Sequence, residues 1–382
     1  MSASSAAAPR GAVIFCRVID NFGDAGVTWR LAKRLSALGF PTTLVVDSIP
    51  TLSKLVPSLP ADALDAEVRG IRILDWDAFE KKADAGDLSQ IGGVWPSLVL
   101  ETFGCRLPDA VEKGLCDERT RLYMNLDYLS AESWVEGSHG IWGLHPTLPV
   151  KKLWFFPGFT DKTGGVLIED DLAAHQAAFS REAFLKTLGA DPARRTLYFF
   201  AYPVNALEAL ATALGECGEA LNLILAPGAA SEKLSALLEG CGNIRLINAP
   251  FVSQEAFDDF LLAADAVIIR GEDSFVRAQL AGTPLLWAVY PTSDKAHEIK
   301  LDAWLERFAA AYGENDVPAQ AAFDRAARAW VDGTLTPDIF RAWLDALPAQ
   351  KAAALRWRAS LFSRGDLARH IAALVPKQES GR

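Results

Sequence analysis

Short apolar runs alternate with helix-like stretches along the first half of the chain. The runs that predict strands occupy, in order, residues 11–19, 42–48, 70–76, 97–104 and 121–130. Between them, residues 27–39 have a helical pattern that stops at Gly39, and residues 109–118 form a shorter helix-like segment. Nearly continuous apolar strands are typical of a parallel sheet that helices cover on both faces. The pattern therefore predicts a mainly parallel α/β domain.

A second and more regular alternation begins near residue 180. Strands and helices are predicted in turn at residues 195–202, 205–216, 221–228, 230–240, 244–251, 253–264, 265–270, 273–282 and 284–291. This spacing predicts a second βαβ domain, and helical stretches after residue 295 complete the chain. Residues 134–170, between the two alternations, are rich in Trp, Gly and Pro and show no clear period. So many aromatic residues favour a structured connection over a free linker.

Length and composition narrow the possible functions. A chain of 382 residues is long for one hydrophobic core, and its net charge of −10 without a basic block argues against a nucleic-acid partner. Five cysteines without a CxxC pair and five scattered histidines predict reduced thiols and no zinc site. The N-terminus lacks a signal-peptide pattern, and no apolar run is long enough to span a membrane. We therefore expect a soluble, cytoplasmic protein of two domains without a membrane partner.

The first candidate for chemistry is the segment VIDNFGDAG, residues 18–26, which follows the first predicted strand. Gly23 and Gly26 permit a tight turn, but the GxGxxG spacing of a dinucleotide site is absent. Asp20 lies where the strand ends, so it is either a functional carboxylate or a turn-forming residue. Asp24 lies near the start of the next helix, where it has the alternative role of a helix cap.

The second candidate is the segment IIRGEDSFVRAQLAG, residues 268–282, in which a strand ends and a helix begins. Arg270 and Gly271 precede a helix N-terminus, whose backbone N–H groups and dipole favour an anion. Glu272, Asp273 and Ser274 have simpler alternative roles, because acidic residues complement the helix dipole and serine caps helices. An arginine, a glycine and three polar residues between two apolar runs nevertheless indicate a binding site.

Aromatic residues mark the carboxyl ends of two further strands. Phe200 and Tyr202 share one face at strand spacing and are candidates to flank a planar base. Core packing is the alternative, and it suits Phe200 better than Tyr202. Phe251 and Gln254 follow the third strand of the second domain. Gln254 either bonds a base edge or only begins the next helix.

Together, these segments resemble the EarP family, the arginine rhamnosyltransferases of elongation factor P. The motifs are NFGDAG after the first strand, FxAY, PFVSQ and RGEDSFVRAQLAGTPLLW, and the resemblance extends over essentially the whole chain. It implies a GT-B glycosyltransferase with two Rossmann-like domains facing across a central cleft. It also implies transfer of L-rhamnose from dTDP-β-L-rhamnose to an arginine of elongation factor P, with inversion and without a metal or cofactor. The modified factor then relieves ribosomes stalled at proline runs.

The resemblance also assigns residues and domains. It implies catalytic roles for Asp20, Asp24 and Glu272, whose separate contributions stay open. Contacts to dTDP-rhamnose are implied for Asn21, Phe22, Gly23, Asp24, Phe200, Tyr202, Phe251, Gln254, Arg270, Gly271, Glu272, Asp273 and Ser274. The expected domains are residues 1–180 for the acceptor, residues 181–355 for the nucleotide sugar, and residues 356–382 as a C-terminal helix that returns to the first domain.

The acidic first segment fits a cationic acceptor. A guanidinium has a pKa above about 12 and delocalised lone pairs, so it is a poor nucleophile. Carboxylates hold such a cation and accept its proton, and Asp20 is our candidate base. Three alternatives stay open: a sugar-nucleotide epimerase, a cell-wall glycosyltransferase, and a noncatalytic protein that binds a nucleotide sugar.

Overall fold

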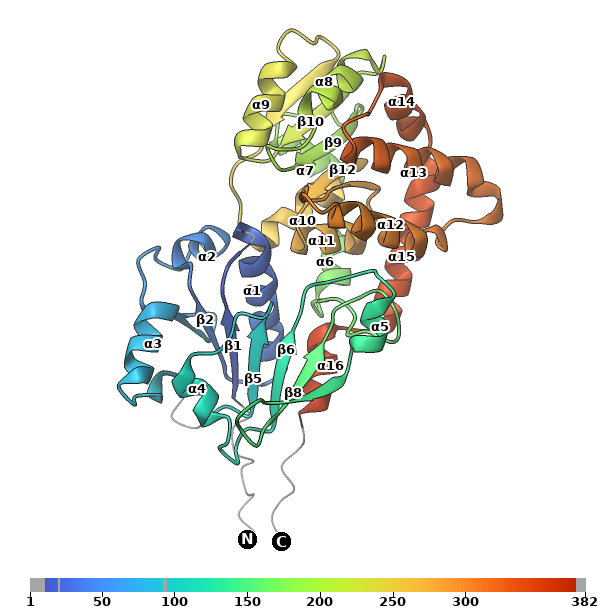
Figure 1. The fold of residues 1–382 in the computed structure, drawn as a ribbon. Helices are drawn as coiled ribbons and strands as arrows, with labels where there is room; N and C mark the ends of the chain where they lie inside the picture. Colours follow the sequence, from blue (N-terminus) through green and yellow to red (C-terminus); the bar gives the residue numbers. More distant parts are fainter. Residues whose placement is uncertain (1–10, 20, 92–94, 376–382) are drawn as a thin grey trace, which may run out of the picture. The chain divides into compact units, whose positions relative to one another are not determined.

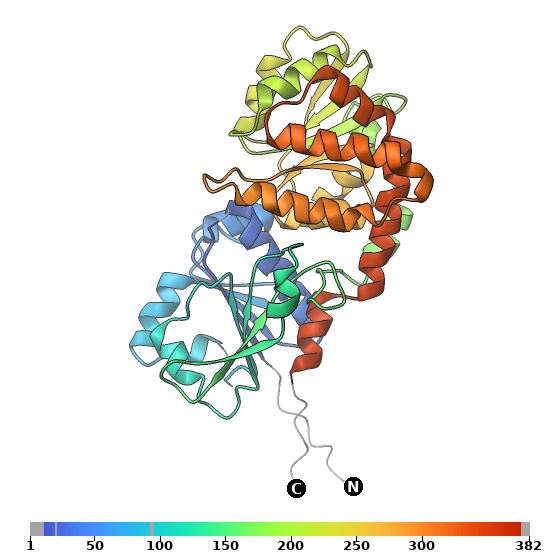
Figure 2. The same cartoon turned by 45° about the vertical axis from the view of Figure 1, so that its right-hand side comes forward.

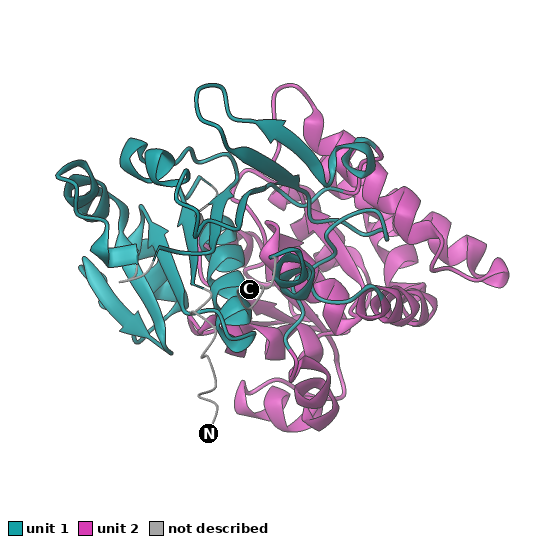
Figure 3. Ribbon diagram, turned by 90° about the horizontal axis from the view of Figure 1, so that it is seen from below, with its two compact units in different colours: residues 1–130, 134–169, 364–382 teal, residues 131–133, 170–363 magenta. Residues whose placement is uncertain are grey.

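The computed structural model describes residues 11–19, 21–91 and 95–375, and it divides the chain into two compact units (Figure 3). Unit 1 comprises residues 1–130, 134–169 and 364–382, and unit 2 comprises residues 131–133 and 170–363. The main divisions therefore fall at 169/170 and 363/364, whereas the sequence led us to expect them near 180 and 356. Among the described residues, no helix combines the length and the apolar character that crossing a membrane requires.

Unit 1 is built on an eight-stranded sheet with the order β3-β4-β2-β1-β5-β6-β8-β7 (Figure 1). Its strands are β1 (Ala12–Cys16), β2 (Thr42–Val46), β3 (Asp65–Val68), β4 (Ile71–Asp75), β5 (Leu98–Thr102), β6 (Leu122–Leu126), β7 (Ile141–Leu144) and β8 (Lys151–Phe155). The edge strands β3 and β7 run antiparallel to their neighbours, and the other pairs are parallel. Ala12 of β1 lies opposite Thr42 of β2 and Leu98 of β5. This arrangement confirms the mainly parallel sheet.

Helices cover both faces of the unit 1 sheet. They are α1 (Asn21–Ala37), α2 (Ile49–Leu55), α3 (Trp76–Asp84), α4 (Asp109–Gly114), α5 (Trp134–Ser138) and α16 (Leu367–Leu374), with a 3₁₀ turn at Ser89–Ile91. One core joins the sheet to α1, α2 and α16 through residues such as Trp29, Leu52 and Ile371. The other core joins the opposite face to α3 and α4. Burial of both faces explains why the strands have apolar side chains in succession.

The segment that we expected to be an aperiodic connection has regular structure. Residues 134–170 contain α5, β7 and β8, and the last two form an antiparallel hairpin that completes the sheet. Gly140 and Gly143, and the two prolines of the loop between the strands, Pro146 and Pro149, interrupt the apolar pattern that would have indicated them. The segment 134–170 is therefore structured, as we expected, but its helix and its two strands were not predicted.

The last described helix, α16, packs in unit 1 although it lies at the end of the chain. Asp366, at its N-cap, accepts hydrogen bonds from the guanidinium of Arg34 in α1 and from the backbone N–H groups of Ile168 and Arg369. Both side chains of the Arg34–Asp366 ion pair are almost fully buried. Removing one partner of such a pair leaves a buried charge, so the pair holds α16 against α1 firmly.

Unit 2 has a five-stranded, wholly parallel sheet with the order β11-β10-β9-β12-β13. The strands are β9 (Arg195–Phe200), β10 (Leu221–Leu225), β11 (Ile244–Asn248), β12 (Ala266–Arg270) and β13 (Leu285–Ala288). The helices between them are α8 (Leu207–Glu216), α9 (Ala229–Leu237), α10 (Gln254–Ala263) and α11 (Asp273–Ala281). Every strand and helix predicted between residues 195 and 291 is confirmed.

The other helices of unit 2 lie before and after this sheet in the chain. They are α6 (Leu172–Ala178), α7 (Arg181–Thr187), α12 (Ala296–Ala309), α13 (Val317–Val331), α14 (Pro337–Asp345) and α15 (Leu347–Arg364), with a 3₁₀ turn at Glu314–Asp316. Figure 2 shows α12 and α13, in orange, side by side.

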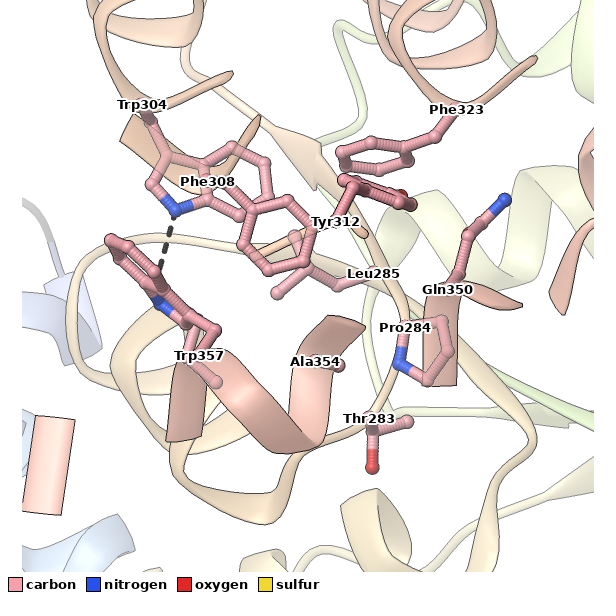
Figure 4. A pocket seen from close by; sticks show the side chains of 11 residues that line it. Thr283, Pro284, Leu285, Trp304, Phe308, Tyr312, Phe323, Gln350, Ala354 and Trp357 are labelled. Carbon is pink, nitrogen blue, oxygen red and sulfur yellow. Dashed lines mark hydrogen bonds between the residues drawn. The ribbon is translucent and has the colours of Figure 1, made fainter. Parts of the chain in front are cut away.

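Aromatic side chains of α12, α13 and α15 surround a cavity of about 10 Å³ in unit 2 (Figure 4). The Gln279 carboxamide oxygen accepts from the indole N–H groups of Trp304 and Trp357, at 3.1 and 2.7 Å. Such a volume holds at most one water molecule. The cavity is thus a small gap in an aromatic core and is too small for a substrate.

Candidate active site

In open α/β sheets, ligands bind outside the carboxyl ends of the strands where the strand order reverses. In unit 2 the chain runs from β9 to β10 and β11 on one side and then adds β12 on the other side, so the reversal lies between β9 and β12. In unit 1 the corresponding reversal lies between β1 and β5. The segments singled out in the sequence follow β1, β9 and β12. Each unit therefore carries predicted site residues at its own reversal point.

Arg270 is the central side chain at the reversal point of unit 2. It ends β12, and its guanidinium carbon lies 4.4 Å from the ring centroid of Phe200 and 4.8 Å from that of Tyr202. Phe200 ends β9, the strand that pairs with β12, which explains the proximity. A cation within about 6 Å of an aromatic face is attracted by the ring quadrupole. The structure thus brings Arg270 onto two aromatic residues that lie 70 and 68 positions earlier in the sequence.

Two helix N-termini meet beside Arg270. Gln254 is the first residue of α10, and its side-chain amide donates to the carboxylate of Asp273, the first residue of α11, at 3.1 Å. Ser253 caps α10, with its hydroxyl accepting the N–H of Ala256. Each helix N-terminus has the equivalent of a partial positive charge, and two together with an arginine favour an anion. Gln254 is thus the first residue of a helix, and its buried side-chain amide forms a hydrogen bond with Asp273 in this structure.

The residues between β12 and α11 have distinct roles. Gly271 has a φ of 70°, a left-handed conformation that favours glycine, and its carbonyl accepts the indole N–H of Trp287 at 3.3 Å. Glu272 is the N-cap residue of α11, but its side chain makes no capping hydrogen bond. The hydroxyl of Ser274 donates to the carbonyl of Arg270. Ser274 therefore does not cap the helix, and that alternative was wrong.

Tyr202 is more buried than its place at a strand end suggested. Only 6% of it is exposed, its N–H donates to the side-chain oxygen of Asn205 at 3.0 Å, and its ring packs edge-on against Tyr290. Phe251, in contrast, is 51% exposed. We did not predict Tyr290, which follows β13 and is 56% exposed. The sequence could have indicated Tyr290. The strand β13 follows β12 in the chain, and the carboxyl ends of parallel neighbours lie at the same edge of the sheet.

In unit 1, the segment after β1 is helical from Asn21 onward. Helix α1 spans Asn21–Ala37, so Phe22, Gly23 and Gly26 belong to its first turns and do not form a glycine turn. The expected start of this helix at residue 27 was wrong by about two turns. Helical glycines are tolerated here because α1 is held by burial in the core rather than by helix propensity.

Asp24 supports the backbone that precedes the helix. Its carboxylate accepts the N–H of Ile19 at 2.7 Å, and the side chain is almost completely buried. Asp47 accepts the neighbouring N–H of Val18 at 2.8 Å, so two carboxylates fix consecutive residues at the end of β1. Ile19 precedes α1, so this bond fixes the backbone before the helix and is not itself a cap of the helix. Asp20 and the side chain of Asn21 lie outside the described part of the structure.

The carboxyl end of β5, beside β1, carries a feature that the sequence did not reveal. Phe103 and Arg106 have φ values of 55° and 54°, which is rare for residues other than glycine. The hydroxyl of Thr102 and the thiol of Cys105 both donate to the carbonyl of Phe15 in β1, at 2.8 and 3.3 Å. These bonds hold a strained loop against the end of β1, and such strain is common near functional sites.

A larger hollow in unit 2 contains none of the predicted site residues. It has a volume of about 680 Å³ and lies at the carboxyl ends of β10 and β11, along α9. Its polar lining includes Ser231, Glu232 and Ser235 of α9, and Glu239, which follows the helix. Within residues 11–19, 21–91 and 95–375, no three or more His, Cys, Asp or Glu side chains gather as metal ligands would.

Comparison with known proteins gives consistent results. Residues 12–376 match the sequence family described as Elongation-Factor P (EF-P) rhamnosyltransferase EarP. A protein-arginine rhamnosyltransferase of Pseudomonas putida is 38% identical, over 93% of this chain and 96% of that protein. One of Pseudomonas aeruginosa is 31% identical, over 94% of this chain and 96% of that protein.

Solved structures give the same picture of the fold. A structure from work on EarP-mediated arginine glycosylation of translation elongation factor EF-P is 27% identical, with a TM-score of 0.61, and covers 94% of this chain and 97% of that chain. A kitacinnamycin glycosyltransferase is 13% identical, with a TM-score of 0.56, and covers 96% of this chain and 100% of that chain. This second likeness shows the fold alone. The two Rossmann-like units are those of a GT-B glycosyltransferase.

Proposed function

Because this chain belongs to the EarP family and is a protein-arginine rhamnosyltransferase, we propose that it transfers L-rhamnose from dTDP-β-L-rhamnose to an arginine of elongation factor P. The anomeric carbon is inverted in the transfer. The observation that carries the proposal is the place of Arg270, beside two helix N-termini and two aromatic rings at the reversal point of unit 2. A nucleoside diphosphate needs such a combination of cation, backbone donors and ring faces.

The donor belongs to unit 2 in this proposal. Arg270 and the N-terminus of α11 bind the diphosphate, and Gly271 lets the backbone approach it closely. A guanidinium that rests on an aromatic face is oriented by the ring, while its N–H groups point along its own plane toward phosphate oxygens. The half-exposed Phe251 contributes most of the aromatic surface for the thymine, and the largely buried Tyr202 contributes a smaller part. The Ser274 hydroxyl fixes the carbonyl of Arg270 and so stabilises the end of β12.

The acceptor arginine belongs to unit 1. Asp20 follows β1 in the sequence and takes the part of general base, while Asp24 holds Ile19 and so positions the residue before Asp20. The carboxylates localise the guanidinium π-system by hydrogen bonding, which makes one nitrogen more nucleophilic. Glu272 assists in orienting the arginine. Elongation factor P modified in this way acts on ribosomes stalled at proline runs.

The reaction is a single displacement. A guanidinium nitrogen forms a bond to the anomeric carbon of rhamnose as the bond from that carbon to the diphosphate oxygen breaks. The electron pair of the broken bond leaves with dTDP, and the nitrogen loses a proton to the carboxylate of Asp20. Arg270 and the helix N-terminus stabilise the charge that develops on dTDP, so we propose that no divalent metal takes part.

The test is incubation of the purified chain with dTDP-β-L-rhamnose and elongation factor P, followed by intact mass measurement of the acceptor. We expect the mass to rise by one deoxyhexose, with no change when the donor is omitted. Fragmentation should place the sugar on an arginine. An unchanged acceptor would contradict the proposal. If dTDP-rhamnose were altered without any acceptor, an epimerase would be favoured, and if it only bound, a noncatalytic role would be favoured.

A further inference from the structure

The strand β7 exposes large apolar side chains at an edge of the unit 1 sheet. It is the last strand in the sheet order, with β8 as its neighbour. Ile141, Trp142 and Leu144 are 51, 53 and 81% exposed. Proteins usually protect sheet edges with charged residues, proline or a covering element, because an unpaired edge invites another chain. An apolar edge that is kept exposed therefore indicates an interaction surface.

The register of the hairpin places these side chains on both faces of the strand. Trp142 and Leu144 lie opposite Leu153 and Lys151 of β8, and Ile141 lies opposite Trp154. The hairpin is firmly attached, because Leu153 is buried in the core and Lys152 forms an ion pair with the buried Glu101, at 2.8 Å. The apolar edge is consequently a preformed platform whose side chains project from a fixed strand.

The charge of this region contrasts with that of the chain. The chain has a net charge of −10, yet no Asp or Glu occurs between Glu136 and Asp161. Lys151, beside Leu144 across the hairpin, is exposed. A partner that suits this edge therefore presents an apolar patch flanked by carboxylates.

We propose that the β7 edge, defined as Ile141, Trp142, Leu144 and Lys151, docks the protein acceptor of the transfer reaction. This inference rests on the proposed function. A carboxylate site that recognises a guanidinium cannot select one arginine among those of all cellular proteins, so selection requires a second surface. The β7 edge belongs to the same sheet as β1, the strand that precedes Asp20, which makes it continuous with the acceptor unit.

The experiment measures steady-state kinetics with elongation factor P as the varied substrate and dTDP-rhamnose in excess. Trp142→Ala should raise the KM for elongation factor P about tenfold, because a tryptophan is often among the few side chains that dominate the binding energy of an interface, and Leu144→Ala should raise it less. The kcat and the KM for dTDP-rhamnose should stay at wild-type values. Lys151→Glu should raise the same KM and weaken its dependence on salt.

Leu64→Ala is the matched control. Leu64 is 62% exposed and precedes β3 at the opposite edge of the same sheet. It should leave all kinetic constants unchanged, and all four variants should unfold at the wild-type temperature. If wild-type chain rhamnosylates elongation factor P and the β7 variants keep a wild-type KM, this inference is wrong while the proposed function stands. Loss of a wild-type dimer in Trp142→Ala at unchanged KM would instead assign the edge to a second copy of the chain.

Discussion

The reversal points of the two sheets carry different charged residues. In unit 2, β12 ends in Arg270, which lies over two aromatic rings beside the N-termini of α10 and α11. In unit 1, β1 is followed by Asp20 and Asp24, and the buried Asp24 carboxylate binds the backbone at Ile19. In our proposal, the same architectural position binds an anion in unit 2 and a cation in unit 1.

On this proposal, the two units share one fold and each binds one substrate of the transfer reaction. A nucleoside diphosphate and a guanidinium carry opposite charges, so a single site would bind one well only by repelling the other. Two separate α/β units can each be matched to one substrate. The parallel sheets determine where a ligand binds, and the residues that follow the strands determine which charge that ligand can carry.

Of the substitutions in the two sites, replacing Arg270 should lower the activity most. Arg270→Ala should lower the turnover on the order of 10² to 10³, because it removes a preorganised charge from the leaving group. Added Mg²⁺ should not restore the activity, and wild-type enzyme should keep full activity in excess EDTA. Arg245→Ala, at an exposed arginine of β11 in the same sheet, is the control. If EDTA abolished the wild-type reaction and Mn²⁺ rescued it, Asp20 and Asp24 would be better explained as metal ligands.

Removing the charge at the end of β1 should have the next largest effect. Asp20→Asn should lower turnover on the order of 10², the usual contribution of a general base. Asp24→Asn should cost less, about tenfold, because the amide oxygen can still accept the N–H of Ile19. Asp47→Asn is the matched control, since Asp47 accepts the adjacent N–H of Val18 in the same way. Turnover near the wild-type value in folded Asp20→Asn would reject its role as the base.

Replacing an aromatic residue of the unit 2 site should have the smallest effect, and this effect should be on dTDP binding. Tyr202→Ala should weaken dTDP binding by about 1–3 kcal/mol, the usual contribution of stacking between a base and an aromatic side chain. Tyr202→Phe keeps the ring and should bind dTDP with nearly wild-type affinity. Calorimetric titration provides both values. Equal affinities of wild type and Tyr202→Ala would mean that Tyr202 only packs against Arg270 and Tyr290.

The two units differ in how clearly their sequences predict their helices and strands, and the reason is physical. In unit 2 each strand is a continuous apolar run separated from the next by one helix, so every element from 195 to 291 was predicted. In unit 1 the hairpin of β7 and β8 interrupts this pattern, and its half-exposed strands contain glycine and neighbouring prolines. Local sequence cannot reveal that such a segment adds to the edge of a sheet formed much earlier in the chain.

The glycines after β1 caused a further error. Gly23 and Gly26 suggested a turn, but the following residues through Ala37 bury a face of α1 that keeps both glycines helical. Tertiary packing overrides local propensity in this way when a helix lies across a sheet. The contacts between Gln254 and Asp273, and between Arg270 and Tyr202, also depend on the order of the strands and had no local signal.

The proposal that unit 2 binds the donor and unit 1 the acceptor is tested most directly by calorimetry. In this experiment dTDP is titrated into the wild-type chain, Arg270→Ala and Asp20→Asn. Arg270→Ala should weaken dTDP binding by about tenfold or more, because it loses a charge-assisted bond to phosphate. Asp20→Asn should bind dTDP with the wild-type affinity, although its turnover is low. If Asp20→Asn weakened dTDP binding as much as Arg270→Ala does, the donor would depend on both units, and the assignment of the first segment to the acceptor would be wrong.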